Sequence, residues 1–85
     1  MSWWVYLLRC RDDTLYCGCT DDLERRCAAH NSGRGAKYTR GRGPVTLVYR
    51  EECPDKSAAL RREAAVKKLS RAEKLRLIES APSRK

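Results

Sequence analysis

The stretch LYCGCTDDLERRCAAH, from Leu15 to His30, combines the signals of a strand, a turn and a helix. Thr14–Gly18 favours a strand, because it contains β-branched and aromatic residues and ends at a glycine. A helix is predicted over Asp21–Asn31, since the aspartate at its start is followed three residues later by Glu24, and acidic side chains stabilise a first helical turn. The sequence Asn-Ser-Gly at 31–33 ends this helix. The stretch therefore predicts a strand that turns directly into a helix.

The residues before this stretch predict a partner strand and hence a hairpin. Trp3–Leu8 is rich in aromatic and branched residues, which is typical of a buried strand. A two-residue loop would put Tyr6 and Tyr16 on opposite faces of the sheet. A three-residue loop would pair Cys10 with Thr14 and put both tyrosines on one face. The residues alone leave both registers open.

The residues after the stretch predict one more strand and two more helices. The strand is expected over Val45–Tyr49 and the helices over Pro54–Leu69 and Ser70–Glu79, the last of which opens on a capping box. The order is thus β-β-α-β-α-α, an α+β fold in which three helices cover a three-stranded sheet. We expect one domain over residues 1–80 and a flexible tail over 81–85.

The composition is strongly basic. The 85 residues include 19 Lys and Arg against 11 Asp and Glu, which gives a formal net charge of +8. An excess of this size favours a polyanionic partner, and nucleic acid is the commonest one. The plainer alternative is a soluble protein that is merely basic.

The cysteines favour a reducing compartment. Five is an odd number, and two of them are separated by one residue, which makes a poor disulfide framework. The apolar run Trp3–Leu8 is too short to cross a bilayer, and no cleavage site follows it. We expect a protein of the cytoplasm, or of the nucleoid or nucleus, that is not secreted and not bound to a membrane. A zinc site is a weaker alternative, because Cys17-x-Cys19 lacks the usual ligand spacing.

Helical spacing places two polar side chains on the apolar face of the first predicted helix. With Leu23 as the apolar anchor, Arg26, Cys27 and His30 follow at i+3, i+4 and i+7, whereas Arg25 points away. An arginine and a histidine on an apolar face are costly unless they are paired or line a cleft. The structural alternatives are that Arg26 extends its head to solvent and that His30 caps the helix end.

The second helix shows the same kind of placement. Ala59, Glu63 and Val66 follow at i, i+4 and i+7, so a carboxylate lies between two apolar positions. The structural alternative is an ion pair between Glu63 and Lys67, four residues later.

These side chains suit phosphate chemistry. An arginine fork binds a phosphate and neutralises charge in the transition state. A single carboxylate can hold one Mg²⁺ whose other ligands are water and substrate oxygens. A tyrosine can take or relay a proton if a nearby cation lowers its pKa from about 10.

The same residues resemble the GIY-YIG endonuclease superfamily. Two short tyrosine motifs, Trp4–Tyr6 and Tyr16–Gly18, lie ten residues apart, and Arg26 follows ten residues after the second tyrosine. Glu63 lies on a later predicted helix, as the family's glutamate does. Small stand-alone members of the family share further segments, which appear here at 31–39 and 67–71.

The resemblance, which spans residues 3–79, implies metal-dependent hydrolysis of phosphodiester bonds. It makes Tyr6 the general base or the residue that orients the attacking water. Tyr16 would support that proton network and contact phosphate. Arg26 would bind the scissile phosphate, and His30 would assist proton transfer or hold phosphate.

The resemblance also implies a metal ligand and a sheet geometry. Glu63 would bind Mg²⁺ or Mn²⁺, and Gly18 would let the backbone pass close to the substrate. The family fold is a small antiparallel three-stranded sheet flanked by helices. It places Tyr6 and Tyr16 on one face, which favours the three-residue hairpin loop.

A glycine-rich segment at 33–44 interleaves cations with a tyrosine, so we expect it to bind nucleic acid. The residues concerned are Arg34, Lys37, Tyr38, Arg40 and Arg42. The predicted substrate is branched, nicked or single-stranded DNA in repair or recombination, with RNA left open. The competing hypothesis is a nucleic-acid-binding module without turnover.

The chain departs from the family pattern at three points. The first motif is Trp-Val-Tyr, and the second has Cys17 at its centre. Many family nucleases use a late asparagine, whereas the sole asparagine here is Asn31. We expect no second domain that selects a substrate, so targeting would need a partner protein or a homodimer.

Overall fold

The computed structural model describes residues 2–31 and 45–80, which form three strands and three helices in the predicted order. The strands make one antiparallel sheet in the spatial order β2-β1-β3, so the predicted α+β fold is confirmed. None of the helices in these two ranges is long and apolar enough to span a membrane. In chain order the elements are β1 (Trp3–Arg9), β2 (Leu15–Thr20), α1 (Leu23–Asn31), β3 (Thr46–Cys53), α2 (Lys56–Lys67) and α3 (Arg71–Ser80).

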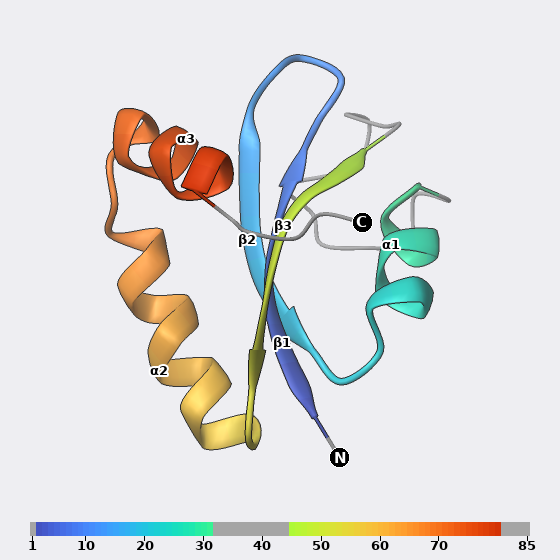
Figure 1. Cartoon of the computed structure of the whole chain (residues 1–85). Helices are drawn as coiled ribbons and strands as arrows, with labels where there is room; N and C mark the ends of the chain where they lie inside the picture. Colours follow the sequence, from blue (N-terminus) through green and yellow to red (C-terminus); the bar gives the residue numbers. More distant parts are fainter. Residues whose placement is uncertain (1, 32–44, 81–85) are drawn as a thin grey trace.

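The sheet is covered on both faces. Figure 1 shows α1 on one side and α2 with α3 on the other. The central strand β1 explains this arrangement, because its successive side chains point to opposite faces. Val5 and Leu7 are fully buried on the side of α2 and α3. Tyr6 and Leu8 are equally buried on the side of α1, so β1 is apolar in both directions.

The turn between β1 and β2 is a three-residue loop, one of the two possibilities that the sequence left open. The Cys10 N–H donates to the Thr14 carbonyl at 2.8 Å, which closes the loop. Asp13 has a φ of 70°, a left-handed conformation that aspartate adopts more readily than most residues. The Thr14 hydroxyl donates to the Asp12 carboxylate at 2.6 Å and holds the turn further.

This loop length sets the register of the hairpin. Tyr6 lies opposite Gly18, and Leu8 lies opposite Tyr16. Both tyrosines therefore share the face toward α1, as the family resemblance implied.

The first helix begins one residue later than its predicted cap. Asp22, and not Asp21, accepts the first hydrogen bond, from the Arg25 N–H at 3.1 Å. The pairing of Asp21 with Glu24 was therefore a wrong prediction. The Thr20 hydroxyl accepts the Asp22 N–H at 3.1 Å. This bond forms a turn over residues 20–22, so the helix begins after Asp22 and not after Asp21.

The other two helices are found near their predicted positions, although α2 begins at Lys56, two residues after the predicted Pro54. The Asp55 carboxylate accepts the Ala58 N–H at 2.8 Å at the start of α2. The predicted capping box of α3 is confirmed, since the Ser70 hydroxyl accepts the Glu73 N–H and the Glu73 carboxylate accepts the Ser70 N–H. The two helices follow one another closely and lie on the same side of the sheet (Figure 1).

The third strand is longer than predicted. The sequence indicated Val45–Tyr49, but the strand runs over Thr46–Cys53. The second half of the strand was not predicted because it contains charged residues, and the structure shows how one of them is stabilised. Glu51 accepts hydrogen bonds from Arg62 of α2 at 2.9 Å and from the Tyr49 hydroxyl at 2.8 Å.

Asn31 joins the end of α1 to the start of β3. Its side-chain oxygen accepts the Val45 N–H at 2.5 Å, and its amide donates to the Val45 carbonyl at 3.4 Å. The helix that carries Arg26 and His30 is thereby tied to the sheet.

Candidate active site

Tyr6, Tyr16 and His30 form a cluster of three rings between the sheet and α1. The Tyr6 hydroxyl and the His30 Nε2 atom are hydrogen-bonded at 3.3 Å. The ring centroids of Tyr16 and His30 are 5.2 Å apart, and Tyr6 lies 6.3 Å from His30 and 6.5 Å from Tyr16. Tyr6 and His30 are each 1% exposed, so His30 points into the molecule rather than out of the helix end.

Gly18 makes room for this cluster. A Cβ atom at this position would lie 2.5 Å from the Tyr6 hydroxyl oxygen and 2.8 Å from the neighbouring ring carbon. The same atom would lie 3.3 Å from the Tyr16 ring. The structure therefore gives Gly18 a packing reason of its own, beside the substrate contact that the resemblance implied.

Arg26 joins the cluster from α1. It faces inward and is half-buried, whereas Arg25 is exposed, so the prediction from helical spacing is confirmed. Its guanidinium is hydrogen-bonded to the Tyr6 side chain, and this bond raises the pKa of Arg26 above its ordinary value. A hydrogen bond to Tyr16 acts in the same direction. The structure thus brings together four of the five predicted catalytic residues.

Burial sets the protonation of the two groups that are hydrogen-bonded at the centre. Burial raises the pKa of Tyr6 to about 12, although the bonded Arg26 opposes this shift. Burial lowers the pKa of His30 below its ordinary value, and the positive charge of Arg26 adds to the effect. At neutral pH the pair is therefore an uncharged phenol beside an uncharged imidazole, which is able to accept a proton.

Glu63 lies on the other side of β2. One carboxylate oxygen forms an ion pair with Lys67 at 3.1 Å, and the other accepts the Cys19 thiol at 3.3 Å. The ion pair is the structural alternative raised by the sequence, yet the Glu63 side chain is also only 15% exposed. Tyr16 connects the two sides, because it lines a hollow at the edge of β2 together with Lys67.

The surroundings of Glu63 suit a cation that keeps most of its water. Within residues 2–31 and 45–80, no three His, Cys, Asp or Glu side chains gather to hold a metal ion. Mg²⁺ is commonly bound through one or two carboxylates, with water and substrate oxygens as the remaining ligands. The single partly accessible carboxylate of Glu63 fits this pattern.

The Cys19 thiol is a contact that the sequence did not predict. Cys19 hydrogen-bonds Glu63, the candidate metal ligand. The spacing of Cys17 and Cys19 could have predicted that they share a face, because alternate residues of a strand point to the same side. Both side chains point toward α2. All five cysteines are free thiols.

The predicted nucleic-acid segment lies outside the described residues. This applies to Arg34, Lys37, Tyr38, Arg40 and Arg42.

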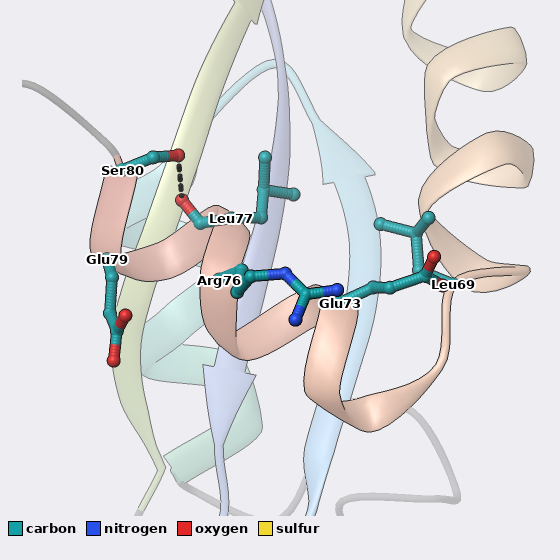
Figure 2. A pocket seen from close by; sticks show the side chains of 6 residues that line it. All are labelled: Leu69, Glu73, Arg76, Leu77, Glu79 and Ser80. Atoms are coloured by element: carbon teal, nitrogen blue, oxygen red, sulfur yellow. Dashed lines mark hydrogen bonds between the residues drawn. The ribbon is translucent and has the colours of Figure 1, made fainter.

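A hollow beside α3 contains none of the predicted site residues. Figure 2 shows its lining of two leucines among charged and polar side chains. The residues are Leu69, Glu73, Arg76, Leu77, Glu79 and Ser80. Leu69 and Leu77 pack on the opposite face of the sheet from the ring cluster, so this hollow is separate from the candidate site.

Comparison with known proteins agrees with the geometry. The family model described as the GIY-YIG catalytic domain matches residues 2–76. The chain therefore belongs to the GIY-YIG catalytic domain family. Domains of this family are generally endonucleases that act on nucleic acids, so the match implies nuclease-like activity.

Similar relatives within the family are small UPF0213 proteins. One from Clostridium perfringens is 57% identical over 77 residues, covering 91% of this chain and 83% of the relative. One from Natronomonas pharaonis is 57% identical over 75 residues, covering 88% of each. The solution NMR structure of a UPF0213 protein from Bacillus halodurans is 49% identical, covers 93% of this chain and 84% of that one, and has a TM-score of 0.60.

Proposed function

We propose that the protein is a divalent-metal-dependent endonuclease that hydrolyses phosphodiester bonds in DNA. The observation that carries this proposal is the buried cluster in which Tyr6, Tyr16, Arg26 and His30 meet on one face of the sheet. Branched, nicked or single-stranded DNA, as formed in repair and recombination, is the proposed substrate, and RNA shares the same phosphodiester chemistry.

The hydrogen bond between Tyr6 and His30 supports a proton relay. The Tyr6 oxygen takes a proton from the attacking water while its own proton passes to the His30 Nε2 atom. The resulting hydroxide forms a bond to phosphorus, the bond to the leaving oxygen breaks, and that oxygen takes a proton from solvent. Because the pKa of Tyr6 is about 12, a concerted transfer avoids a free phenolate at neutral pH.

Arg26 supplies a positive charge beside the scissile phosphate. Its guanidinium already lies beside both tyrosine hydroxyl groups, and its fork has donors left for phosphate oxygens. Negative charge develops on those oxygens in the transition state, so a fixed cation there lowers the barrier.

Glu63 is the proposed ligand of Mg²⁺ or Mn²⁺. When bound, such an ion polarises a phosphate oxygen and lowers the pKa of coordinated water. Lys67 and Cys19 hold the two carboxylate oxygens in a defined orientation. Lys67 would have to give up its ion pair with one oxygen for that oxygen to bind the ion.

A second candidate function is nucleic-acid binding without turnover. The observation that favours it is that both oxygens of Glu63 are already engaged, on the side of β2 away from the ring cluster.

Incubation with supercoiled plasmid and Mg²⁺ or Mn²⁺ separates the two functions. We expect the wild-type protein to nick the plasmid, and Tyr6→Phe and Glu63→Ala to lose this activity while keeping the wild-type melting temperature within a few degrees. Full cleavage by Glu63→Ala would contradict the metal role. Binding of DNA by the wild-type protein with no cleavage under either metal would favour the module without turnover.

A further inference from the structure

Two hollows meet along the outer edge of β2. β2 is an end strand of the sheet formed by the described residues, and α2 packs against it. The first hollow has a volume of about 270 Å³ and the second about 210 Å³, and both are lined by Leu15 and Lys74. We call the two together the edge groove. Its lining is Thr14, Leu15, Tyr16, Cys17, Lys67, Arg71 and Lys74.

Three cations line the edge groove along one side. Lys67 ends α2, and Arg71 and Lys74 come from the first turns of α3. The bend between these helices therefore brings three positive charges to one strand edge. The opposite side is formed by β2, where Leu15 and Tyr16 are half-buried.

The cations keep donors for a ligand. Lys67 pairs with Glu63, but its side chain is 54% exposed. Arg71 pairs with Asp13 at 3.1 Å through one nitrogen, which leaves other N–H groups of its fork. Lys74 makes no ion pair within the described parts of the chain.

The positive field reaches into the groove. Burial raises the pKa of the Cys17 thiol to about 11, and the charge of Glu63 adds to this rise. Lys67 and Lys74 act in the opposite direction, so both ammonium groups interact with the centre of β2. The two nearby carboxylates, Glu63 and Asp13, are each engaged by a cation, which limits their repulsion of an anion.

We propose that the edge groove binds the phosphodiester backbone of one strand of the nucleic-acid substrate as it leaves the ring cluster. The identity of the ligand rests on the proposed function. Tyr16 belongs both to the ring cluster and to the groove, so a strand with one phosphate at the cluster continues directly between β2 and the three cations. A row of cations beside partly apolar side chains is the arrangement that follows a single strand without reading its sequence.

Binding of a short fluorescent single-stranded oligonucleotide, measured over a series of salt concentrations without divalent metal, tests the groove separately from catalysis. Lys74→Gln removes a groove cation that forms no ion pair with another described residue. Arg76→Gln is the matched control, because it removes one charge from the same helix but lies in the hollow of Figure 2. We expect Lys74→Gln to weaken binding roughly threefold to tenfold at low salt and to reduce the slope of log K against log salt by about 0.7, as for one lost phosphate contact.

The expected result is a larger effect of Lys74→Gln than of Arg76→Gln, with circular dichroism unchanged in both. Equal effects of the two variants, no effect of Lys74→Gln, or no binding by the wild-type protein would overturn the proposal. The expected difference in a protein that cleaves no plasmid would support the groove and contradict only the proposed hydrolysis.

Discussion

Gly18 determines how closely the Tyr6 ring approaches the sheet. Two Tyr6 atoms, the hydroxyl oxygen and the ring carbon that carries it, lie 2.5 and 2.8 Å from the place where any other residue would carry its Cβ atom. The hydroxyl group of Tyr6 reaches His30 because of this close approach. One missing methyl group on β2 thus supports a hydrogen bond to a residue on α1.

Gly18→Ala is expected to disturb the ring cluster. The added methyl group would meet the Tyr6 hydroxyl at 2.5 Å, so the ring must shift, at a cost of about 1–3 kcal/mol in the free energy of unfolding. Denaturant unfolding measures this cost. The double variant Gly18→Ala with Tyr6→Phe removes the nearest atom and should recover part of the loss; no recovery would show that the strain lies elsewhere.

Arg26→Ala is expected to lower the rate of plasmid cleavage roughly 100- to 1,000-fold, the range for loss of one group that stabilises transition-state charge. Arg25→Ala should retain most of the rate, because Arg25 is exposed whereas Arg26 is half-buried against the ring cluster. Steady-state cleavage rates of the two variants make the comparison. Similar losses would contradict an active role for the inward face of α1.

The helix α1 carries two site residues and is short. Its first turn is capped by Asp22, and its last residue, Asn31, is bonded to the start of β3. Because nine-residue helices are marginal on their own, these end contacts hold Arg26 and His30 in place.

Asp22→Ala is expected to destabilise the protein by about 1 kcal/mol, as the loss of an N-cap does. Asp21→Ala should have little effect, because the Arg25 N–H bonds to Asp22. Thermal unfolding of the two variants at one pH measures the difference. A greater loss of stability for Asp21→Ala than for Asp22→Ala would show that Asp21 is the N-cap, as the sequence predicts.

The sequence predicts elements well where local chemistry decides them. The Ser70–Glu73 box and the inward placement of Arg26 follow from spacing within one helix, and both are found. The second half of β3 was missed, because Glu51 is stabilised there by Arg62 from a different element. The contact between Cys19 and Glu63 was missed for the same reason, since 44 residues separate the two side chains.

At the scale of the whole molecule, the only histidine of the chain is also the most deeply placed polar residue of the described core. His30 is 1% exposed and is held without charge, while it is free to take up a proton when the chain unfolds. Folding and protonation are therefore linked through one side chain.

The free energy of unfolding is expected to fall as the pH falls from 7 to 5. The pKa of His30 is lowered in the folded state, so below the ordinary value of 6.5 the unfolded chain binds the proton first, with a limiting slope of about 1.4 kcal/mol per pH unit. Urea unfolding of the wild-type protein and of His30→Gln over this range isolates the effect. A variant with an undiminished pH slope would show that other groups cause it.

The hairpin loop has a consequence for how this fold can vary. Because the loop has three residues, even and odd positions of β2 point to different faces of the sheet. Tyr16 and Gly18 belong to the ring cluster, and Cys17 and Cys19 lie on the side of α2. Deleting a single loop residue would shift the register by one residue and move each set of side chains to the other face. The length of a turn that contributes no residue to the ring cluster is thus as strict a requirement for this centre as the identity of its tyrosines.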